Sequence, residues 1–389
     1  MGIPPVSGVT INEHSHDPTI GSKRVLWVST SLRTPGGMTT FVTTMRDTPL
    51  WQAWGIEFIA THRSGSRTAR VLAFARGLVS YLWVLTTRRP DLVHLHSGKE
   101  GSFVRKAILL WLARIARIPV VLHVHAGRFA LFYDRTPPSG QSVIRRTLAA
   151  ASVVVALGRG WSRSLQDIAP DAHLISIPNP VRIVGVGTRV GEGEAVHVVF
   201  LGKMCADKGT FALLDAWARL RDDGSGARAR LTLAGNGEVD RVRELVAHHG
   251  LAGSVEVRSW LSAAEVDELL GTAHVLTLPS RNEGQPMSVL EAMGRGLCVV
   301  ATSVGGIPDL VEDGRSAILV PPDDVDGLAV ALRTVILDPD TRHRLGDAAL
   351  DRARRSFDVD IIWRRFDALY RELGEGRSLA RSQDVEAPR

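Results

Sequence analysis

The sequence of 389 residues has little of several features that mark specialised protein classes. It holds two cysteines, Cys205 and Cys298, far apart in the chain, which excludes a disulfide framework and a cysteine zinc cluster. Its longest apolar run, Gly77 to Leu85, is far too short to cross a bilayer. No apolar block precedes Val25, so the N-terminus does not resemble a secretory signal. These absences predict a soluble protein of a reducing cytoplasm.

The composition is otherwise that of a globular protein, and the length favours two domains. The charge is uneven: residues 1–190 hold 23 Lys and Arg against 9 Asp and Glu, a net +14, which leaves 24 against 32 and a net −8 for residues 191–389. The basic half is expected to face something anionic, such as a membrane surface or an acceptor with phosphates. Nucleic acid is not expected, because zinc-finger spacing and RNP-like motifs are missing and aromatic residues make up only 6%.

Short apolar runs alternate with longer amphipathic stretches along the whole chain. The runs predict strands at Val25–Ser29, Glu57–Ala60, Leu92–His96, Val120–His125, Val153–Leu157 and Leu174–Ile177, and then at Val196–Gly202, Arg230–Ala234, Val255–Arg258, His274–Pro279, Cys298–Thr302 and Ile318–Val320. Near-continuous apolar strands that alternate with helices are typical of parallel sheets covered on both faces. The pattern therefore predicts an α/β chain with two doubly wound, Rossmann-like domains.

The stretches without periodicity predict the domain limits. The expected segments are a disordered tail at 1–21, a first domain at 22–177, a linker at 178–195, a second domain at 196–356, a helix at 357–373 and a disordered tail at 374–389. The last helix follows the second sheet, so it either returns to the first domain or caps the second.

Candidate binding residues gather in the segment Pro279–Gly296, which follows a buried strand and opens a helix. Pro286 suits the start of a helix but not its interior. Glu283 and Gly284 then lie at the carboxyl end of a parallel strand, where doubly wound folds bind ligands, and the first N–H groups of the helix suit a phosphate. Glu291 lies one to two turns inside the helix, where its carboxylate can accept hydrogen bonds from a diol. Either glutamate alone would be an ordinary helix-dipole acid, but the whole set favours a ligand site.

The pattern E-G-x-P-x-S-x-L-E-A-M that begins at Glu283 resembles the retaining glycosyltransferases of family four, the glycosyl transferases group 1. Further matches are Val299–Thr302, Gly305–Pro308, Phe200–Lys203, Asp207–Gly209 and Leu233–Gly237, and, more weakly, Pro35–Gly37, Asp91–His94 and Val121–His125. The resemblance covers essentially all of residues 196–370. It implies a GT-B architecture, in which two Rossmann-like domains face a central cleft.

The resemblance also implies a role for each matching residue. Glu283 corresponds to an acid that contacts the donor sugar or the departing phosphate, and Glu291 to one that binds the ribose hydroxyls. Lys203 and Lys208 correspond to a basic pair that neutralises the diphosphate, although arginine is usual at the first position. The loop that holds the sugar and the β-phosphate corresponds to the backbone of Gly284, Gln285, Met287 and Ser288, and Gln285 replaces a larger apolar residue.

Glycines and histidines follow the strands of the first half. The pair Gly36-Gly37 precedes a helix, where it either lets a donor phosphate approach the backbone or forms an ordinary loop. The motifs His94-x-His96 and His123-x-His125 each place two side chains on one sheet face. The resemblance implies that His125 lies beside the donor sugar. His94 and His96 are assigned to the acceptor side, with structural strand-end histidines as the alternative. No bound metal is expected, because the family typically works without one and no cysteine lies nearby.

Two stretches of the first half, Thr68–Thr87 and Ser102–Arg117, predict amphipathic helices with basic flanks. The basic residues are Arg70, Arg76, Arg88 and Arg89 in and after the first helix, and Arg105, Lys106, Arg114 and Arg117 in the second. Such helices can lie in a membrane surface with their arginines against lipid phosphates. Alternatively, they face a protein core and their arginines are merely solvated.

The sequence therefore predicts a cytoplasmic, retaining, metal-independent enzyme. It would move a hexosyl residue from a nucleotide-diphosphate sugar to a saccharide or lipid-linked acceptor, in polysaccharide or glycolipid assembly. The expected catalytic residues are His125, Lys208 and Glu283, in a front-face displacement where the leaving diphosphate helps to deprotonate the acceptor. Attachment to the inner face of the plasma membrane is left open. The alternatives are a nucleotide-sugar epimerase or hydrolase on the same fold, and an inert homologue that binds the donor.

Overall fold

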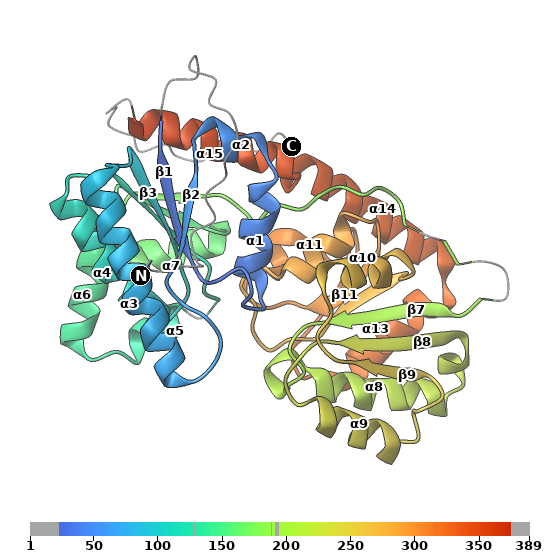
Figure 1. Ribbon diagram of the computed structural model, residues 1–389. Helices are drawn as coiled ribbons and strands as arrows, with labels where there is room; N and C mark the ends of the chain where they lie inside the picture. The colour runs from blue at the N-terminus through green and yellow to red at the C-terminus, as the bar shows by residue number, and fades with distance from the viewer. Residues whose placement is uncertain (1–22, 128, 188, 191–193, 375–389) are drawn as a thin grey trace, which may run out of the picture. The chain divides into compact units, whose positions relative to one another are not determined.

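The computed structural model describes residues 23–127, 129–187, 189, 190 and 194–374, and the chain forms two compact units. The first unit comprises the residues up to Ile177 together with those from Ile362 onward, and the second runs from Pro178 to Ile361. Each unit is built on one parallel six-stranded sheet (Figure 1), which confirms the predicted α/β class. The predicted tails at 1–21 and 374–389 lie outside the described residues, apart from Gly374.

The first sheet has the strand order β2-β1-β3-β4-β5-β6. Its strands are β1 Val25–Ser29, β2 Glu57–Ala60, β3 Leu92–Ser97, β4 Val120–Val124, β5 Val153–Ala156 and β6 Leu174–Ser176. Each strand was predicted to within one residue at its end, because β-branched and other apolar residues dominate the runs.

Helices cover both faces of this first sheet. They are α1 Gly37–Arg46, α2 Pro49–Ala53, α3 Arg67–Thr87, α4 Gly101–Ile115, α5 Phe129–Asp134, α6 Pro138–Ala150, α7 Arg159–Ile168 and α15 Val359–Gly374. A hydrophobic core joins one face of the sheet to α3, α4, α5, α6 and α7. On the other face, Phe41 of α1 and Phe366 of α15 pack against the side chains of β1, β3 and β4. The last helix therefore returns to the first unit from Ile362 onward.

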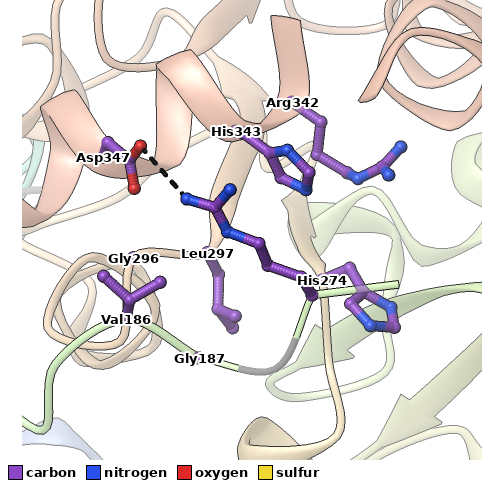
Figure 2. A pocket seen from close by; sticks show the side chains of 9 residues that line it. Val186, Gly187, His274, Gly296, Leu297, Arg342, His343 and Asp347 are labelled. Atoms are coloured by element: carbon purple, nitrogen blue, oxygen red, sulfur yellow. Dashed lines mark ion pairs between the residues drawn. The ribbon is translucent and has the colours of Figure 1, made fainter. Parts of the chain in front are cut away.

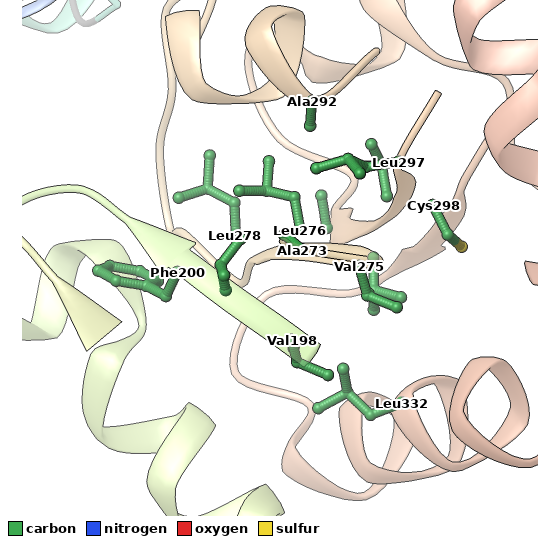
Figure 3. Packing of buried hydrophobic residues seen from close by; sticks show 14 of the residues in the cluster. Val198, Phe200, Ala273, Val275, Leu276, Leu278, Ala292, Leu297, Cys298 and Leu332 are labelled. Carbon is green, nitrogen blue, oxygen red and sulfur yellow. The ribbon is translucent and has the colours of Figure 1, made fainter. Parts of the chain in front are cut away.

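The second sheet has the strand order β12-β11-β10-β7-β8-β9. Its strands are β7 Val196–Leu201, β8 Ala229–Ala234, β9 Val255–Arg258, β10 Val275–Leu278, β11 Cys298–Thr302 and β12 Ile318–Val320. The helices of the second unit are α8 Thr210–Asp222, α9 Val239–His248, α10 Ala263–Gly271, α11 Met287–Met293, α12 Ile307–Leu310, α13 Val325–Leu337 and α14 Pro339–Ser356. Short 3₁₀ turns lie at Ala206–Lys208 and Ser225–Arg228. Figure 3 shows the core of this unit, where Val198 of β7 and Leu276 of β10 lie between helices.

The segment predicted as a linker starts on the second unit. Val181 forms an isolated parallel bridge with Asp358, in which its N–H donates to the carbonyl of Phe357 at 2.8 Å and its carbonyl accepts from Val359 at 2.9 Å. The two stretches that connect the units, one at residues 177–181 and one at 358–362, therefore run beside each other.

Two sequence expectations on the basic helices need correction. The run Gly77–Leu85 lies within α3, a 21-residue helix that is long and apolar enough to cross a membrane by length and composition, although the run alone is too short. Lys106 was expected among the basic residues that flank an interface, but it is buried on the core side of α4. Its Nζ donates to Thr61 Oγ1 at 2.6 Å, and burial lowers its pKa to about 7.

Candidate functional site

The predicted site of the second half lies at the point where the strand order of the second sheet reverses. From β7 the chain builds β8 and β9 on one side and then β10, β11 and β12 on the other. The loops that follow β7 and β10 therefore leave the same edge of the sheet beside each other, and doubly wound folds bind ligands at such a crevice. Lys203 and Lys208 lie in the loop after β7, and Glu283 lies in the loop after β10.

A glycine brings these two loops into contact. Gly209 has a φ of 69°, and a Cβ at this position would lie 1.9 Å from the carbonyl oxygen of Pro279. No other residue type fits there without a shift of the backbone. The backbone N–H of Arg281 donates to the carbonyl of Asp207 at 2.9 Å and fixes the same contact. The loop after β10 is therefore held beside Lys208.

Lys208 and Glu283 form an ion pair across the two loops. Lys208 Nζ lies 2.5 Å from Glu283 Oε1, and Ser280 Oγ donates to the same oxygen at 2.6 Å. The Glu283 side chain is 5% exposed and that of Lys208 is 29% exposed. The carboxylate thus positions an ammonium group at the carboxyl edge of the sheet, the edge at which doubly wound folds bind ligands. Lys203 is exposed in the same loop, next to the contact of Met204 with Gly237.

The loop of Glu283 and Gly284 rests on the glycine pair that follows β11. Gly305 has a φ of 56°, and a Cβ there would lie 1.9 Å from the carbonyl oxygen of Glu283. Gly306 donates its N–H to the carbonyl of Gly284 at 2.9 Å, and its own Cβ would lie 2.1 Å from that oxygen. Both glycines are required by this close approach of two backbones. The Gly305-Gly306 pair of the sequence motif therefore fixes the backbone of the loop that contains Glu283 and Gly284.

Helix α11 begins at Met287, directly after Pro286, as the position of the proline predicted. No side chain of the described residues caps this helix. The first N–H groups, including those of Met287 and Ser288, therefore lack acceptors within the helix.

Glu291 lies one turn into α11 and is partly exposed. Burial raises the pKa of its carboxyl to about 7, and the nearby Arg295 opposes that rise. The Arg295 guanidinium bonds the Glu291 backbone carbonyl and the Asp267 carboxylate instead of the Glu291 side chain. Glu291 thus has an acceptor group available for a ligand hydroxyl.

Gln285 stands where the family has a larger apolar residue, and its side chain points to the predicted linker. Its Oε1 accepts from the backbone N–H of Asn179 at 2.5 Å, and Asn179 Nδ2 donates to the Gln285 carbonyl at 3.1 Å. Both residues are buried. Sequence reasoning missed Asn179, and its place between Pro178 and Pro180 in a segment without periodicity was the only signal.

The glycine pair of the first unit also lies at a reversal of strand order. From β1 the chain builds β2 on one side and β3 to β6 on the other. Gly36 follows β1 with a φ of 138°, and α1 begins at Gly37 without a side-chain cap. A Cβ at Gly36 would meet nothing within 4 Å, so the backbone conformation requires glycine and the space beside it is open.

His94 and His96 share one sheet face, as the sequence predicts, but neither side chain is exposed. Both are fully buried on the sheet face that α1 and α15 cover, together with His123. The Tyr370 hydroxyl accepts from the indole N–H of Trp27 at 3.0 Å and lies 2.5 Å from His94 Nδ1. Phe366 of α15 packs against His94 and Phe41 of α1 packs against His96, so the burial of both rings favours the alternative of structural strand-end histidines over the acceptor-side assignment.

His125 ends this row and is partly exposed. Its Nε2 lies 3.1 Å from His96 Nδ1, and its backbone N–H donates to the Ser97 carbonyl at 2.8 Å. Burial lowers the pKa of its ring to about 3, so the ring is neutral at physiological pH. His125 can offer a hydrogen bond to a ligand, but it carries no charge.

His94, His96 and His123 are close enough to suggest a metal site, with ligand nitrogens within 4.8 Å of one another. A bound zinc ion holds each nitrogen at about 2.0–2.1 Å, which brings the ligand atoms closer together than this. The rings of His94 and His96 instead stack at 4.3 Å and 19°. The three histidines do not fit a metal without rearrangement, and the absence of a catalytic metal stays a prediction.

A small pocket in the second unit lies at the wrong edge of the sheet for this chemistry. Figure 2 shows His274 and Leu297, which precede β10 and β11, beside His343 and Asp347 of α14. An ion pair between Arg189 and Asp347, at 3.9 Å, crosses the pocket. Because these residues lie at the amino ends of parallel strands, the pocket is separate from the site at the carboxyl ends.

Two family models match the chain in succession. Residues 21–180 match the glycosyl transferase 4-like domain, and residues 195–338 match glycosyl transferases group 1. The chain is 26% identical over 326 residues to the alpha-D-kanosaminyltransferase of Streptomyces kanamyceticus, which covers 78% of this chain and 83% of that protein. It is 28% identical over 316 residues to the D-inositol 3-phosphate glycosyltransferase of Streptomyces bingchenggensis, over 74% of this chain and 68% of that one.

Solved structures share the fold. The sucrose-phosphate synthase of Thermosynechococcus elongatus matches with a TM-score of 0.76 at 17% identity, over 91% of this chain and 100% of the other. Anabaena Alr3699/HepE in complex with UDP-glucose matches with a TM-score of 0.69 at 21% identity, over 90% and 99%. These likenesses confirm the predicted GT-B fold.

Proposed function

The chain belongs to the family-four glycosyltransferases (glycosyl transferases group 1), and from this premise we propose that it moves a hexosyl residue from a nucleotide-diphosphate sugar to a saccharide or lipid-linked acceptor with retention of the anomeric configuration. The observation that carries the proposal is the Lys208–Glu283 pair at the strand-order reversal of the second sheet. A nucleotide-diphosphate sugar is also the ligand that a solved relative of the same fold holds, as UDP-glucose.

Each candidate site residue of the second unit has a chemical role in this proposal. Lys208 and Lys203 neutralise the diphosphate, and Lys208 acts most strongly when the sugar–phosphate bond breaks and charge builds on the leaving oxygen. The uncapped start of α11 accepts a phosphate or sugar oxygen at the N–H groups of Met287 and Ser288. Glu291 accepts hydrogen bonds from the ribose hydroxyls.

The reaction needs no enzymic nucleophile. The bond from the anomeric carbon to the β-phosphate oxygen breaks, and the acceptor oxygen bonds that carbon on the same face. The acceptor proton passes to the leaving phosphate oxygen. Glu283 is held by Lys208 and Ser280, so its task is to fix the ammonium group and to contact the sugar hydroxyls. His125 supplies a neutral hydrogen-bonding group to the substrate.

The proposal includes a cytoplasmic location and independence of metal ions. Cys205 and Cys298 are free thiols in the structure, which suits a reducing compartment. Two lysines and a helix start supply the positive charge that a divalent cation would otherwise supply to the diphosphate. Activity that survives exhaustive EDTA treatment is expected, and activity that returns only with added Mg²⁺ or Mn²⁺ would refute this part.

A panel of nucleotide sugars and candidate acceptors tests the function. Thermal shift first finds the donor, because a ligand that binds the folded state raises its stability. NMR of the product then reports the anomeric configuration. Transfer with the α-configuration kept from an α-linked donor supports the proposal. Free sugar, an epimerised donor or binding without turnover would favour the hydrolase, the epimerase or the inert homologue.

A further inference from the structure

The outward face of α4 is apolar where a helix of a soluble protein is normally polar. Val104, Ile108, Trp111 and Ile115 follow one another at intervals of four, three and four residues, so they form one stripe along the helix. All four are exposed, and Ile115 is 79% exposed. The inward face of the same helix is complete, because Phe103, Leu109 and Leu110 are buried in the core.

Helix α3 carries a second set of exposed apolar side chains. They are Val71, Leu72, Val79, Leu82 and Trp83, and Val79 is 68% exposed. The Tyr81 hydroxyl of α3 donates to the Leu109 carbonyl of α4 at 2.8 Å, so the two helices lie side by side over the same sheet face (Figure 1). We call these nine exposed residues of α3 and α4 the α3–α4 face.

The charged side chains within the helices of this face are all basic, and the neighbouring acids Glu57 and Glu100 lie outside these helices, paired with Arg88 and Lys99. Helices α3, α4 and α6 contain no Asp or Glu. Exposed arginines surround the apolar side chains, among them Arg70, Arg76, Arg114, Arg117 and Arg146. The basic excess of the first half is therefore concentrated where large apolar side chains are exposed, a combination that matches a surface with an anionic exterior and an apolar interior.

We propose that the α3–α4 face docks on an anionic bilayer, with both helices in the plane of the interface. The apolar stripes enter the boundary between head groups and acyl chains, and the arginines contact lipid phosphates. Helix α3 does not cross the membrane in this arrangement, although its length would allow it. A Cβ at Gly77 would lie 2.7 Å from the Ala60 carbonyl, and this close contact anchors α3 on the sheet.

A second copy of the chain fits this face less well. A two-fold dimer through the face would place arginines of one copy opposite arginines of the other, because an isologous contact pairs each patch with itself. Nucleic acid is also disfavoured, since seven aliphatic side chains lie among two tryptophans and would gain little from a sugar–phosphate backbone. The membrane proposal does not rest on the catalytic roles above, and its test needs no substrate.

The test is co-sedimentation of the full chain with vesicles. Vesicles of phosphatidylcholine alone are compared with vesicles that hold 40% phosphatidylglycerol, at rising NaCl concentrations. Binding to the anionic vesicles is expected, and it should weaken as salt rises because surface charges are screened. Binding that is equal on both vesicle types, or absent on both, would overturn the proposal.

Two triple variants separate charge from apolar contact. In Arg76→Gln/Arg114→Gln/Arg117→Gln, each lost arginine should weaken binding about fivefold, so the three together should weaken it about a hundredfold. In Trp83→Ser/Ile108→Ser/Ile115→Ser, at least a tenfold loss is expected because three inserted side chains are removed. Exposed side chains are changed in both, and circular dichroism with a melting curve verifies the fold.

Matched controls come from the second unit. Arg228→Gln/Arg243→Gln/Arg355→Gln removes three exposed arginines, and Trp260→Ser/Val330→Ser/Leu337→Ser removes three exposed apolar side chains. Both controls should bind vesicles like the parent. If the face variants sediment like the parent, the proposal is wrong. If they instead convert a dimer into a monomer in sedimentation velocity without a change in vesicle binding, the face is a contact between copies.

Discussion

Replacement of Lys208 by methionine should separate binding from catalysis in this enzyme. The ammonium group lies 2.5 Å from Glu283 at a helix start, where a diphosphate is expected. Negative charge on the leaving oxygen is larger in the transition state than in the bound donor, so the ammonium group stabilises the transition state more. Loss of one such charged donor typically lowers kcat by 10²–10³-fold, or about 3–4 kcal/mol. The affinity for the donor should fall by less than about tenfold, because Lys208 is 29% exposed and water replaces part of its interaction.

The same substitution leaves Glu283 with a single partner, Ser280. A buried carboxylate that loses its cation destabilises the fold, here by about 1–3 kcal/mol after allowance for the exposed lysine. The double variant Lys208→Met/Glu283→Gln removes the unpaired charge, so it should regain most of that stability. It should not regain activity, because the ammonium group is still missing. This difference keeps a folding defect from being mistaken for a catalytic one.

The assay combines steady-state kinetics, calorimetric titration of the nucleotide sugar and urea denaturation. Lys23→Met serves as the control, because this exposed lysine of the first unit lies outside the predicted site. If kcat and the affinity of the Lys208 variant fall by equal factors, the lysine contributes uniform binding and the transition-state argument is wrong. Recovery of kcat in the double variant would equally refute the assigned role.

Three further outcomes are expected. Glu291→Ala should weaken nucleotide affinity by about 1–3 kcal/mol in calorimetry, and an unchanged Kd in a folded variant would remove the ribose role. Gly305→Ala should lower the free energy of unfolding in urea by more than about 1 kcal/mol and abolish turnover, whereas a stable, active variant would show that the loop does not depend on this contact. His123 is buried with a pKa well below its usual range, so the unfolded chain binds a proton that the folded chain excludes, and stability falls as pH drops below about 6.5. His123→Leu should therefore stabilise the protein more at pH 5 than at pH 8, and an equal effect at both would contradict the linkage.

The site of the second unit was predictable because backbone geometry builds it. A position with a positive φ, or one in contact with another backbone, requires glycine and can therefore be recognised in the sequence, as at Gly209 and Gly305. Pro286 marks the helix start in the same way. Side-chain contacts leave no such mark. The hydrogen bonds between Asn179 and Gln285 join residues 106 positions apart, and either residue alone suits a polar loop.

The errors in the first unit have one cause, which is that strand and helix periodicity gives a side chain's face but not what covers it. His94 and His96 share a sheet face in either case. Phe366 and Tyr370 cover His94 from a helix more than 260 residues later in the chain, and Phe41 of α1 packs against His96. Lys106 is buried on the core side of α4, where Thr61 Oγ1 accepts a hydrogen bond from its ammonium group. The long hydrocarbon stem of lysine can be buried while its ammonium group reaches a polar partner, so helical position alone does not predict whether a lysine is buried. The neighbouring stripe from Val104 to Ile115 shows the opposite case, because four apolar residues at helical spacing predict a buried face and all four are exposed in the structure. In each instance the missing information is the identity of the partner surface, and for α3 and α4 the vesicle experiment is designed to supply it.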